Sequence, residues 1–360
     1  MKRVGAALVI GTALMVSSTA APARVPAPVL EKVRARATQA KFDGTILIGE
    51  RDGTSETFSL GPKAPPPDAV WRWASITKQL TAVIAMQEVA RGKLDVEAPV
   101  ARYWPDWKAP FGRWIRIRDL LLHNSGLPQP DASPEDKDGI PAFYRSAAKS
   151  PKVSAGGFCA GLARGSPPQK FEYNNCDSIV LAEVLARVTG KPFEQLLKER
   201  LAKPLGMQTF GMFQLNGPPA KHVQPTGEFS DKDRLLNLGV YGASGGAYGT
   251  IDDLWKFDHA LLGKQLLADD MKEKMWASSR DNGYYGFFQW IYPAALKGCA
   301  KPVRIVERQG LIGGIELRNY IMPESGRALI MFSRHRPTEL GDPWEGKGFA
   351  YDLLSAVACR

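Results

Sequence analysis

The stretch "WRWASITKQLTAVIAMQEVARG", residues 71–92, decides how this chain of 360 residues is interpreted. Its apolar residues recur at helical spacing, and Gly92 follows as a stop signal, so the pattern predicts one long buried helix from about Ser75. The helix opens with the tetrad SITK, whose serine (Ser75) and lysine (Lys78) stand three positions apart. Residues at that spacing share one face of a helix, so the amine of Lys78 can reach the hydroxyl of Ser75.

This pairing predicts a nucleophilic serine with its own base. A serine hydroxyl is a poor nucleophile until a base takes its proton. Burial disfavours the charged form of lysine, so a buried Lys78 has a lowered pKa and can act as that base. The free N–H groups and dipole at the start of the helix stabilise negative charge near the oxygen of Ser75.

A second proton carrier is predicted at Tyr173, in the one Y-x-N motif of the sequence, which ends at Asn175. Tyrosine ionises near pH 10 in water, but a neighbouring ammonium group favours the phenolate. Tyr173 and Lys78 are therefore expected to move protons together. The alternative for Tyr173 alone is a core tyrosine that forms a hydrogen bond in a loop.

Two other serines compete with Ser75. Ser244 lies in Gly-Ala-Ser-Gly-Gly, the G-x-S-x-G pattern of the α/β-hydrolase nucleophile, and His335 could serve as its histidine. The preceding residues do not alternate between strand and helix as that fold requires. Ser146 opens a second S-x-x-K tetrad with Lys149, but it lies late in a short predicted helix, where its hydroxyl would bond its own backbone. Ser75 is therefore the predicted nucleophile.

The N-terminus has the layout of a secretory signal peptide. Three residues with two positive charges precede an apolar run at 4–16, and small residues follow as far as Ala23. We predict cleavage after Ala20 or Ala23 and export to the periplasm or the medium, the alternative being an uncleaved anchor. No later stretch is apolar enough to cross a membrane.

Charge distribution argues against a nucleic-acid partner. The formal charge of +10 falls to +8 when the signal is removed, and the basic residues are dispersed rather than grouped in blocks. A solvated surface is the favoured interpretation, with weak affinity for an anionic cell envelope as a lesser one.

The cysteines and histidines do not predict a metal site, because none of the four cysteines has C-x-x-C spacing and the four histidines are scattered. In an exported protein an even number of cysteines fits two disulfides, with three pairings possible. Proximity along the chain favours Cys159–Cys176 and Cys299–Cys359, and burial as free thiols is the alternative.

Strand signals occur at both ends of the chain and helix signals in the middle. Expected strands are 44–53, 55–61, 284–292, 302–308, 314–322 and 327–335, and expected helices are 29–40, 75–91, 177–190, 192–206, 250–263 and 348–358. We therefore predict an α/β (α+β) protein with an antiparallel sheet flanked by helices and an inserted, mostly helical lobe. The predicted parts are a signal peptide (1–23), an α/β lobe (24–93 and 275–360) and a helical lobe (94–274), with the active site between the lobes.

Four stretches together resemble the serine β-lactamase and penicillin-binding-protein-like hydrolases, especially the branch with class C β-lactamases, D-alanyl-D-alanine carboxypeptidases and family VIII esterases. They are WRWASITKQLTAVIAMQEVARGKLDVEAPVARYWP (71–105), IRDLLLHNSGLP (117–128), FEYNNCD (171–177) and GASGGAYGTIDDLWKF (242–257). The resemblance implies a β-lactamase/transpeptidase-like fold without a cofactor. It also implies that Ser244 lies in a loop near the site and is not the nucleophile.

The chain departs from this family at its third motif, Lys or His followed by Thr or Ser and Gly. In the corresponding strand we take Arg308-Gln309-Gly310 as the counterpart. By that match the backbone N–H groups of Ser75 and Leu311 form the oxyanion hole. Arg308 is expected to face the substrate and to grip a carboxylate with two hydrogen bonds, and Asn175 to bind substrate or Lys78.

The alternative for Arg308 is an ion pair with a neighbouring acid, Glu307 or Glu316. The sequence as a whole predicts an exported serine hydrolase that acts through an acyl-enzyme on small carboxylic esters or amides. A β-lactam or a D-alanyl peptide is the second choice of substrate. An inactive binding protein on the same fold is the alternative from another class.

Overall fold

The computed structural model describes residues 25–145, 155–161, 165–215, 223, 235–334 and 340–359. The predicted signal peptide, the Ser146–Lys149 tetrad and His335 lie outside these residues. Within them, no helix is both long and apolar enough to span a membrane.

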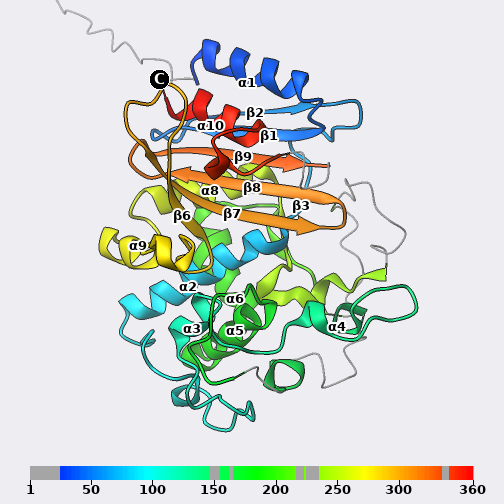
Figure 1. Cartoon of the computed structure of the whole chain (residues 1–360), viewed down its shortest axis with the longest axis vertical. Helices are drawn as coiled ribbons and strands as arrows, with labels where there is room; N and C mark the ends of the chain where they lie inside the picture. Colours follow the sequence, from blue (N-terminus) through cyan, green and yellow to red (C-terminus); the bar gives the residue numbers. More distant parts are fainter. Residues whose placement is uncertain are drawn as a thin grey trace, which may run out of the picture.

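A six-stranded antiparallel sheet forms the upper half of the molecule as drawn in Figure 1. The strand order is β2-β1-β9-β8-β7-β6. The N-terminal and C-terminal parts of the chain therefore meet within the sheet, where β1 pairs with β9. The strands are β1 (Gly44–Gly49), β2 (Ser55–Leu60), β6 (Trp290–Ala294), β7 (Val303–Ile312), β8 (Ile315–Met322) and β9 (Arg327–Ser333).

Both faces of this sheet are covered, because successive strand residues point to opposite sides. In β1, Ile46 and Ile48 belong to one buried cluster, with residues of α1 (Ala27–Gln39) and α10 (Phe349–Ala358). Leu47 belongs to the other, with residues of α2 (Thr77–Ala90) and α8 (Ile251–Leu262). Figure 1 shows α1 at the top of the view, α10 overlapping the strands near β1 and β9, and α2 below the sheet.

A largely helical layer lies below α2 in Figure 1. Its helices are α3 (Ile117–Leu121), α4 (Ala142–Arg145), α5 (Asn175–Thr189) and α6 (Phe193–Leu197), which continues through a π-helical turn (Lys198–Ala202) into α7 (Lys203–Leu205). Helix α9 (Asp269–Met275) lies beside α2. A small three-stranded sheet has the order β3 (Trp71–Arg72), β5 (Ala247–Gly249), β4 (Gly211–Met212).

The structure confirms the predicted fold class, a mixed α/β protein whose antiparallel sheet is flanked by helices. Helix α8 packs against β1 and β9, although the sequence places it within the predicted helical stretch. Its Trp255 fills the space above Gly49, where an added Cβ would lie 2.4 Å from the indole ring. The limits of the two predicted lobes remain a proposal.

The predicted strand at 284–292 is wrong over residues 284–289, since β6 begins only at Trp290. Tyr284 and Phe288 have positive φ angles of 58° and 59°, which a strand does not allow. The aromatic pattern reflects burial in a turn instead. The carbonyl of Phe288 accepts a hydrogen bond from Arg308, and the N–H of Phe288 donates one to the carbonyl of Leu121.

Two disulfides link the pairs that proximity along the chain favours. Cys159 and Cys176 have Cα atoms 5.4 Å apart, and Cys299 and Cys359 have Cα atoms 4.9 Å apart. The first joins the segment around residue 159 to the start of α5, and the second joins the end of the chain to the turn between β6 and β7.

Candidate active site

Ser75 lies in a single 3-10 turn (Ala74–Ile76) that leads into α2, so the α-helix begins two residues later than predicted. Ala74 has a φ of 46°, an unfavourable angle for a residue with a side chain. Strand β7 reaches this turn at Gly310, where an added Cβ would lie 2.6 Å from the carbonyl oxygen of Trp73. Glycine therefore allows β7 to pass directly beside the serine.

The structure brings Ser75, Lys78 and Tyr173 together. The phenol of Tyr173 donates a hydrogen bond of 2.7 Å to Ser75 Oγ, and Lys78 Nζ lies 3.4 Å from the same oxygen. Lys78 comes from α2, whereas Tyr173 comes from the loop before α5, so the contact depends on how these two segments pack. The serine thus faces two groups that can accept its proton.

Lys78 is fully buried and firmly held. Its Nζ donates hydrogen bonds of 2.7 Å to Asn175 Oδ1 and 2.7 Å to the carbonyl oxygen of Ser244. Burial lowers the pKa of Lys78 to about 8, despite the opposing influence of the Tyr173 phenolate. Asn175 therefore contacts the lysine, one of the two partners predicted for it.

Tyr173 is flanked by two positive charges. Lys78 Nζ lies 4.7 Å from the centre of its ring, and Arg308 Nη2 donates a hydrogen bond of 2.6 Å to its oxygen. Burial alone would raise the pKa of Tyr173, but the charges of Arg308 and Lys78 outweigh it and lower that pKa. The arrangement favours the phenolate, the form that can take a proton from Ser75.

The guanidinium of Arg308 is only 1% exposed and lies in the wall of the site. Besides Tyr173, it donates to the carbonyl oxygen of Ser75 (2.8 Å), the hydroxyl of Tyr285 (3.1 Å) and the carbonyl oxygen of Phe288 (3.2 Å). Four of its five N–H groups are therefore used within the protein. These contacts leave no pair of N–H groups free for the predicted two-bond grip on a substrate carboxylate.

The alternative pairing of Arg308 with an acid is also not observed. Glu307 and Glu316 both form ion pairs with Arg318, at 2.9 Å and 2.5 Å. Residues 307 and 308 point to opposite faces of β7, which separates the two carboxylates from the site. Sequence alone could not assign these faces because the register of β7 was uncertain.

Ser244 takes part through its backbone. Its hydroxyl donates a hydrogen bond of 2.6 Å to the carbonyl oxygen of Tyr241, within the 3-10 helix Leu238–Ser244. Its own carbonyl oxygen is the acceptor for Lys78 described above. The segment is a turn beside the site, as the family resemblance implies.

Sequence reasoning missed a buried pair behind Tyr173. The ring of His123 packs against that of Tyr173, with centroids 4.7 Å apart, and His123 Nδ1 lies 2.7 Å from Asp177 Oδ2. Burial, together with the charges of Lys78 and Arg308, lowers the pKa of His123 well below its usual value, so the imidazole is neutral. The signal was present in the stretch IRDLLLHNSGLP, but spacing alone gave His123 no partner.

A second missed group extends from Lys78 towards the surface. Asn175 Nδ2 donates a hydrogen bond of 2.8 Å to the hydroxyl of Tyr144, and that hydroxyl donates to Asp131 Oδ1. Tyr144 and Asp131 lie in the loop-rich part of the sequence, where no periodic pattern indicated which side chains point inward. The four side chains form one continuous chain of hydrogen bonds.

Ser75 opens into a cavity of about 370 Å³. The lining residues come from the serine turn, the 3-10 helix Pro130–Ala132, the Y-x-N motif, the segment around the 3-10 helix Leu238–Ser244, and strands β6 and β7. They are Ala74, Ser75, Asp131, Tyr173, Asn175, Tyr241, Gly245, Trp290, Arg308, Gln309, Leu311 and Ile312. Gly310 forms the contact behind them, and Leu311 is 56% exposed at the rim.

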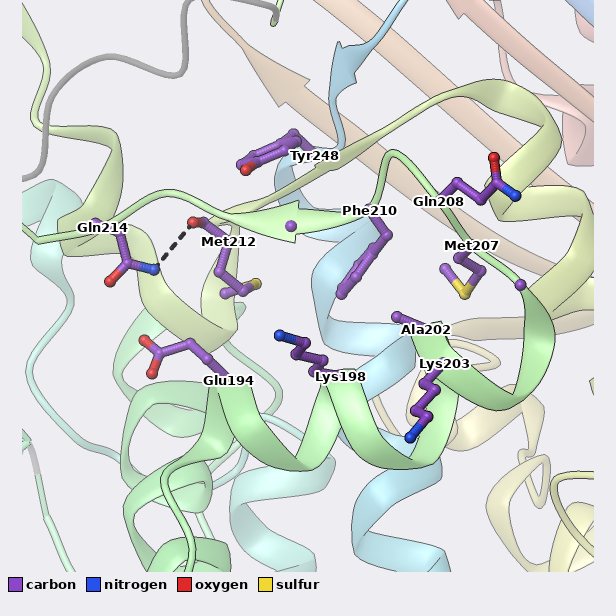
Figure 2. A pocket seen from close by; sticks show the side chains of 12 residues that line it. Glu194, Lys198, Ala202, Lys203, Met207, Gln208, Phe210, Met212, Gln214 and Tyr248 are labelled. Atoms are coloured by element: carbon purple, nitrogen blue, oxygen red, sulfur yellow. Dashed lines mark hydrogen bonds between the residues drawn. The ribbon is translucent and has the colours of Figure 1, made fainter.

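A second cavity, of about 510 Å³, lies beside α6 and the π-helical turn (Figure 2). Lys198 and Lys203 come from the helical segment on one side, and Phe210, Met212 and Tyr248 lie opposite (Figure 2). None of the predicted site residues lines it. The chemistry is therefore concentrated in the smaller cavity. In the described part of the chain, no cluster of three or more His, Cys, Asp or Glu side chains could hold a metal ion.

Comparison with known proteins gives a consistent family. The family model described as "Beta-lactamase" matches residues 30–344. A protein of Bacillus subtilis (strain 168) named as penicillin-binding protein PbpX is 26% identical over 262 residues, which are 72% of this chain and 60% of that protein. The D-alanyl-D-alanine-carboxypeptidase/endopeptidase AmpH of Escherichia coli (strain K12) is 29% identical over 313 residues, 78% of this chain and 75% of AmpH. An esterase is also among the relatives.

Solved structures show the same fold. The D-amino acid amidase from Ochrobactrum anthropi SV3 superposes with a TM-score of 0.72 and covers 92% of this chain and 99% of its own. At 20% identity the likeness concerns the fold alone. These proteins are named as a penicillin-binding protein, a carboxypeptidase/endopeptidase, an esterase and an amidase.

Proposed function

The chain belongs to the beta-lactamase family, since the family model matches residues 30–344, and we propose that it is an exported serine hydrolase that acts through an acyl-enzyme. The observation that carries this proposal is the contact of Ser75 Oγ with Tyr173 and Lys78, at 2.7 Å and 3.4 Å. Export rests on the signal peptide predicted at 1–23 and agrees with the two disulfides, since disulfides persist in oxidising compartments.

In the first step Ser75 Oγ attacks the carbonyl carbon of the substrate. Its proton passes to the Tyr173 phenolate, which Arg308 and Lys78 stabilise, and from the Tyr173–Lys78 pair it passes to the leaving alcohol or amine. The bond between the carbonyl carbon and the leaving group breaks, and the acyl group remains on Ser75.

In the second step water attacks the same carbonyl carbon. The Tyr173–Lys78 pair takes a proton from this water and returns one to Ser75 as the acyl–oxygen bond breaks. The products are a carboxylic acid and the alcohol or amine released earlier. No cofactor enters either step.

The oxyanion formed in both steps would bind the backbone N–H groups of Ser75 and Leu311. The close contact of Gly310 with Trp73 supports this assignment, because it holds β7 beside the serine turn. Leu311 lines the same cavity as Ser75.

Small carboxylic esters or amides are the proposed substrates. A cavity of about 370 Å³ suits a compact acyl group. Arg308 stands in place of the Lys or His of the family's third motif, and its N–H groups do not leave a free pair for binding a substrate carboxylate. A β-lactam or a D-alanyl peptide is the second candidate, favoured by likeness to PbpX and AmpH. The remaining alternative is a binding protein that has this fold but no turnover. The contacts of Ser75 with Tyr173 and Lys78 argue against it.

Two serine variants test the proposal. Ser75→Ala should remove nearly all hydrolysis of a p-nitrophenyl ester, whereas Ser244→Ala should retain much of it, since only the backbone carbonyl of Ser244 meets Lys78. Hydrolysis that survives in Ser75→Ala and disappears in Ser244→Ala would overturn the assignment. Circular dichroism of both variants controls for folding.

A further inference from the structure

Asp131 brings a negative charge to the catalytic cavity. It lies in the short 3-10 helix Pro130–Ala132, is solvent-exposed, and is the one carboxylate among the described residues that line the cavity. Within the described residues it forms no ion pair with a lysine or arginine. Arg308, the other charged residue of the lining, is occupied by Ser75, Tyr173, Tyr285 and Phe288.

The carboxylate of Asp131 is held in place from one side. Its Oδ1 accepts a hydrogen bond from the hydroxyl of Tyr144. Tyr144 is 3% exposed and stacks on Tyr241, with ring centroids 4.3 Å apart and an angle of 10° between the planes. The buried tyrosine restrains one carboxylate oxygen, and Oδ2 has no hydrogen-bond partner in the described part of the chain.

Asp131 is also connected to the catalytic base. Tyr144 accepts a hydrogen bond from Asn175 Nδ2, and Asn175 Oδ1 accepts one from Lys78 Nζ. Asp131 is therefore the outer end of a hydrogen-bonded chain whose inner end is Lys78, beside Ser75. A charged ligand group bound to Asp131 would lie at that outer end. Asp131, Tyr241 and Ser75 line one cavity, so a group bound at Asp131 shares that space with the reacting carbonyl.

We propose that Asp131 binds the ammonium group of the substrate, so that the preferred substrates are esters or amides of amine-bearing acids, such as aminoacyl compounds. This inference rests on the proposed serine hydrolase function and deepens it. The ammonium forms a charge-assisted hydrogen bond with Oδ2 of Asp131. The apolar walls at Tyr241, Trp290 and Leu311 leave room for the side chain of the acyl group.

The same charge acts against acidic substrates. A carboxylate near Asp131 meets a like charge, and Arg308 has no fork free to offset it. The preference among small esters should therefore follow the sign of the acyl substituent, with ammonium above neutral and neutral above carboxylate. This order reverses the expectation drawn from Arg308 in the sequence.

The test compares alanine methyl ester with methyl propionate and with monomethyl succinate at pH 7, where an α-amino group is largely protonated. Wild type should favour the alanine ester over methyl propionate by about tenfold or more in kcat/KM, measured for both enantiomers by release of acid. In Asp131→Asn that ratio should fall to about one, and Asp131→Lys should favour the succinate ester.

Asp106→Asn is the matched control, because Asp106 is exposed and does not line the cavity. It should keep the wild-type ratio. An equal ratio in wild type and Asp131→Asn, or no preference for the ammonium substrate in wild type, would overturn the role of Asp131. Hydrolysis of methyl propionate by wild type and by Ser75→Ala is measured separately. A failed ammonium preference and a failed nucleophile assignment therefore give different results.

Discussion

Arg308 Nη2 lies 2.6 Å from the phenol oxygen of Tyr173 and donates a hydrogen bond to it. The family motif that the chain resembles has Lys or His at the equivalent position. An arginine keeps its positive charge at all relevant pH values and cannot relay a proton. Its effect on the site is therefore electrostatic, and it lowers the pKa of both Tyr173 and Lys78.

Removal of this charge should change the pH dependence of the enzyme. In Arg308→Gln the pKa values of Tyr173 and Lys78 rise, so their basic forms appear at higher pH. The rising limb of kcat/KM against pH should move to the alkaline side, and activity at pH 7 should fall about tenfold for every pH unit by which that limb moves. Arg304→Gln, a surface change on the same strand, should leave the profile in place. A profile of Arg308→Gln that coincides with that of wild type would contradict this electrostatic role.

Lys78 should be required for acylation. Lys78→Ala removes the buried amine that contacts Ser75. General-base assistance contributes about 10²–10⁴-fold to a rate, so the acylation rate should fall by about 10²-fold or more. Because burial lowers the pKa of Lys78 to about 8, wild-type kcat/KM should rise as pH increases towards that value. Stopped-flow acylation with a p-nitrophenyl ester measures both effects. Lys198→Ala, in the other cavity (Figure 2), is the control, and near-normal acylation in Lys78→Ala would exclude the lysine from the mechanism.

Gly310 should not tolerate a side chain. In Gly310→Ala the added Cβ would lie 2.6 Å from the carbonyl oxygen of Trp73, so β7 must move away from the serine turn. We expect a loss of stability of about 1–3 kcal/mol, as for overpacking, and a larger relative loss of kcat than of substrate binding. Gly263→Ala is the control, since its nearest neighbour would lie 3.5 Å away. Thermal unfolding and steady-state kinetics check this, and an unchanged kcat in Gly310→Ala would count against the proposed oxyanion site.

The two disulfides should have separable effects. The bridge between Cys159 and Cys176 closes 17 residues and that between Cys299 and Cys359 closes 60. Chain entropy then assigns them about 3 and about 4 kcal/mol of stability. Cys299→Ala/Cys359→Ala should therefore lower the melting temperature more. Cys159→Ala/Cys176→Ala should lower activity more, because Cys176 adjoins Asn175. Peptide mapping without reductant that finds four free thiols in exported protein would refute both pairings.

Local patterns predicted much of the fold. The helix after Ser75, the neighbouring strands at each end and the helix at 250–263 all follow from short-range periodicity and turn residues, and the structure has them within a few residues. The turn around Phe288 was missed because an aromatic run is equally consistent with a strand and with a buried loop. Positive φ angles at residues with side chains leave no signal in a single sequence.

The site was predicted in part for a related reason. The contact of Lys78 with Ser75 follows from helical spacing, and Tyr173 follows from its motif. The bonding of Arg308 and the position of Asp131 depend on strand register and loop packing, which are long-range properties. The sequence therefore pointed to Ser75, Lys78 and Tyr173, but it could not show how Arg308 is bonded or where Asp131 lies.

Covalent labelling tests the central claim most directly. Wild-type protein, incubated with a fluorophosphonate and digested, should carry the added mass on the peptide that contains Ser75, at a stoichiometry approaching one label per chain. Ser75→Ala should remain unlabelled, and Ser244→Ala should be labelled like wild type. A label on the peptide that contains Ser244, or no label on folded wild-type protein, would contradict the account.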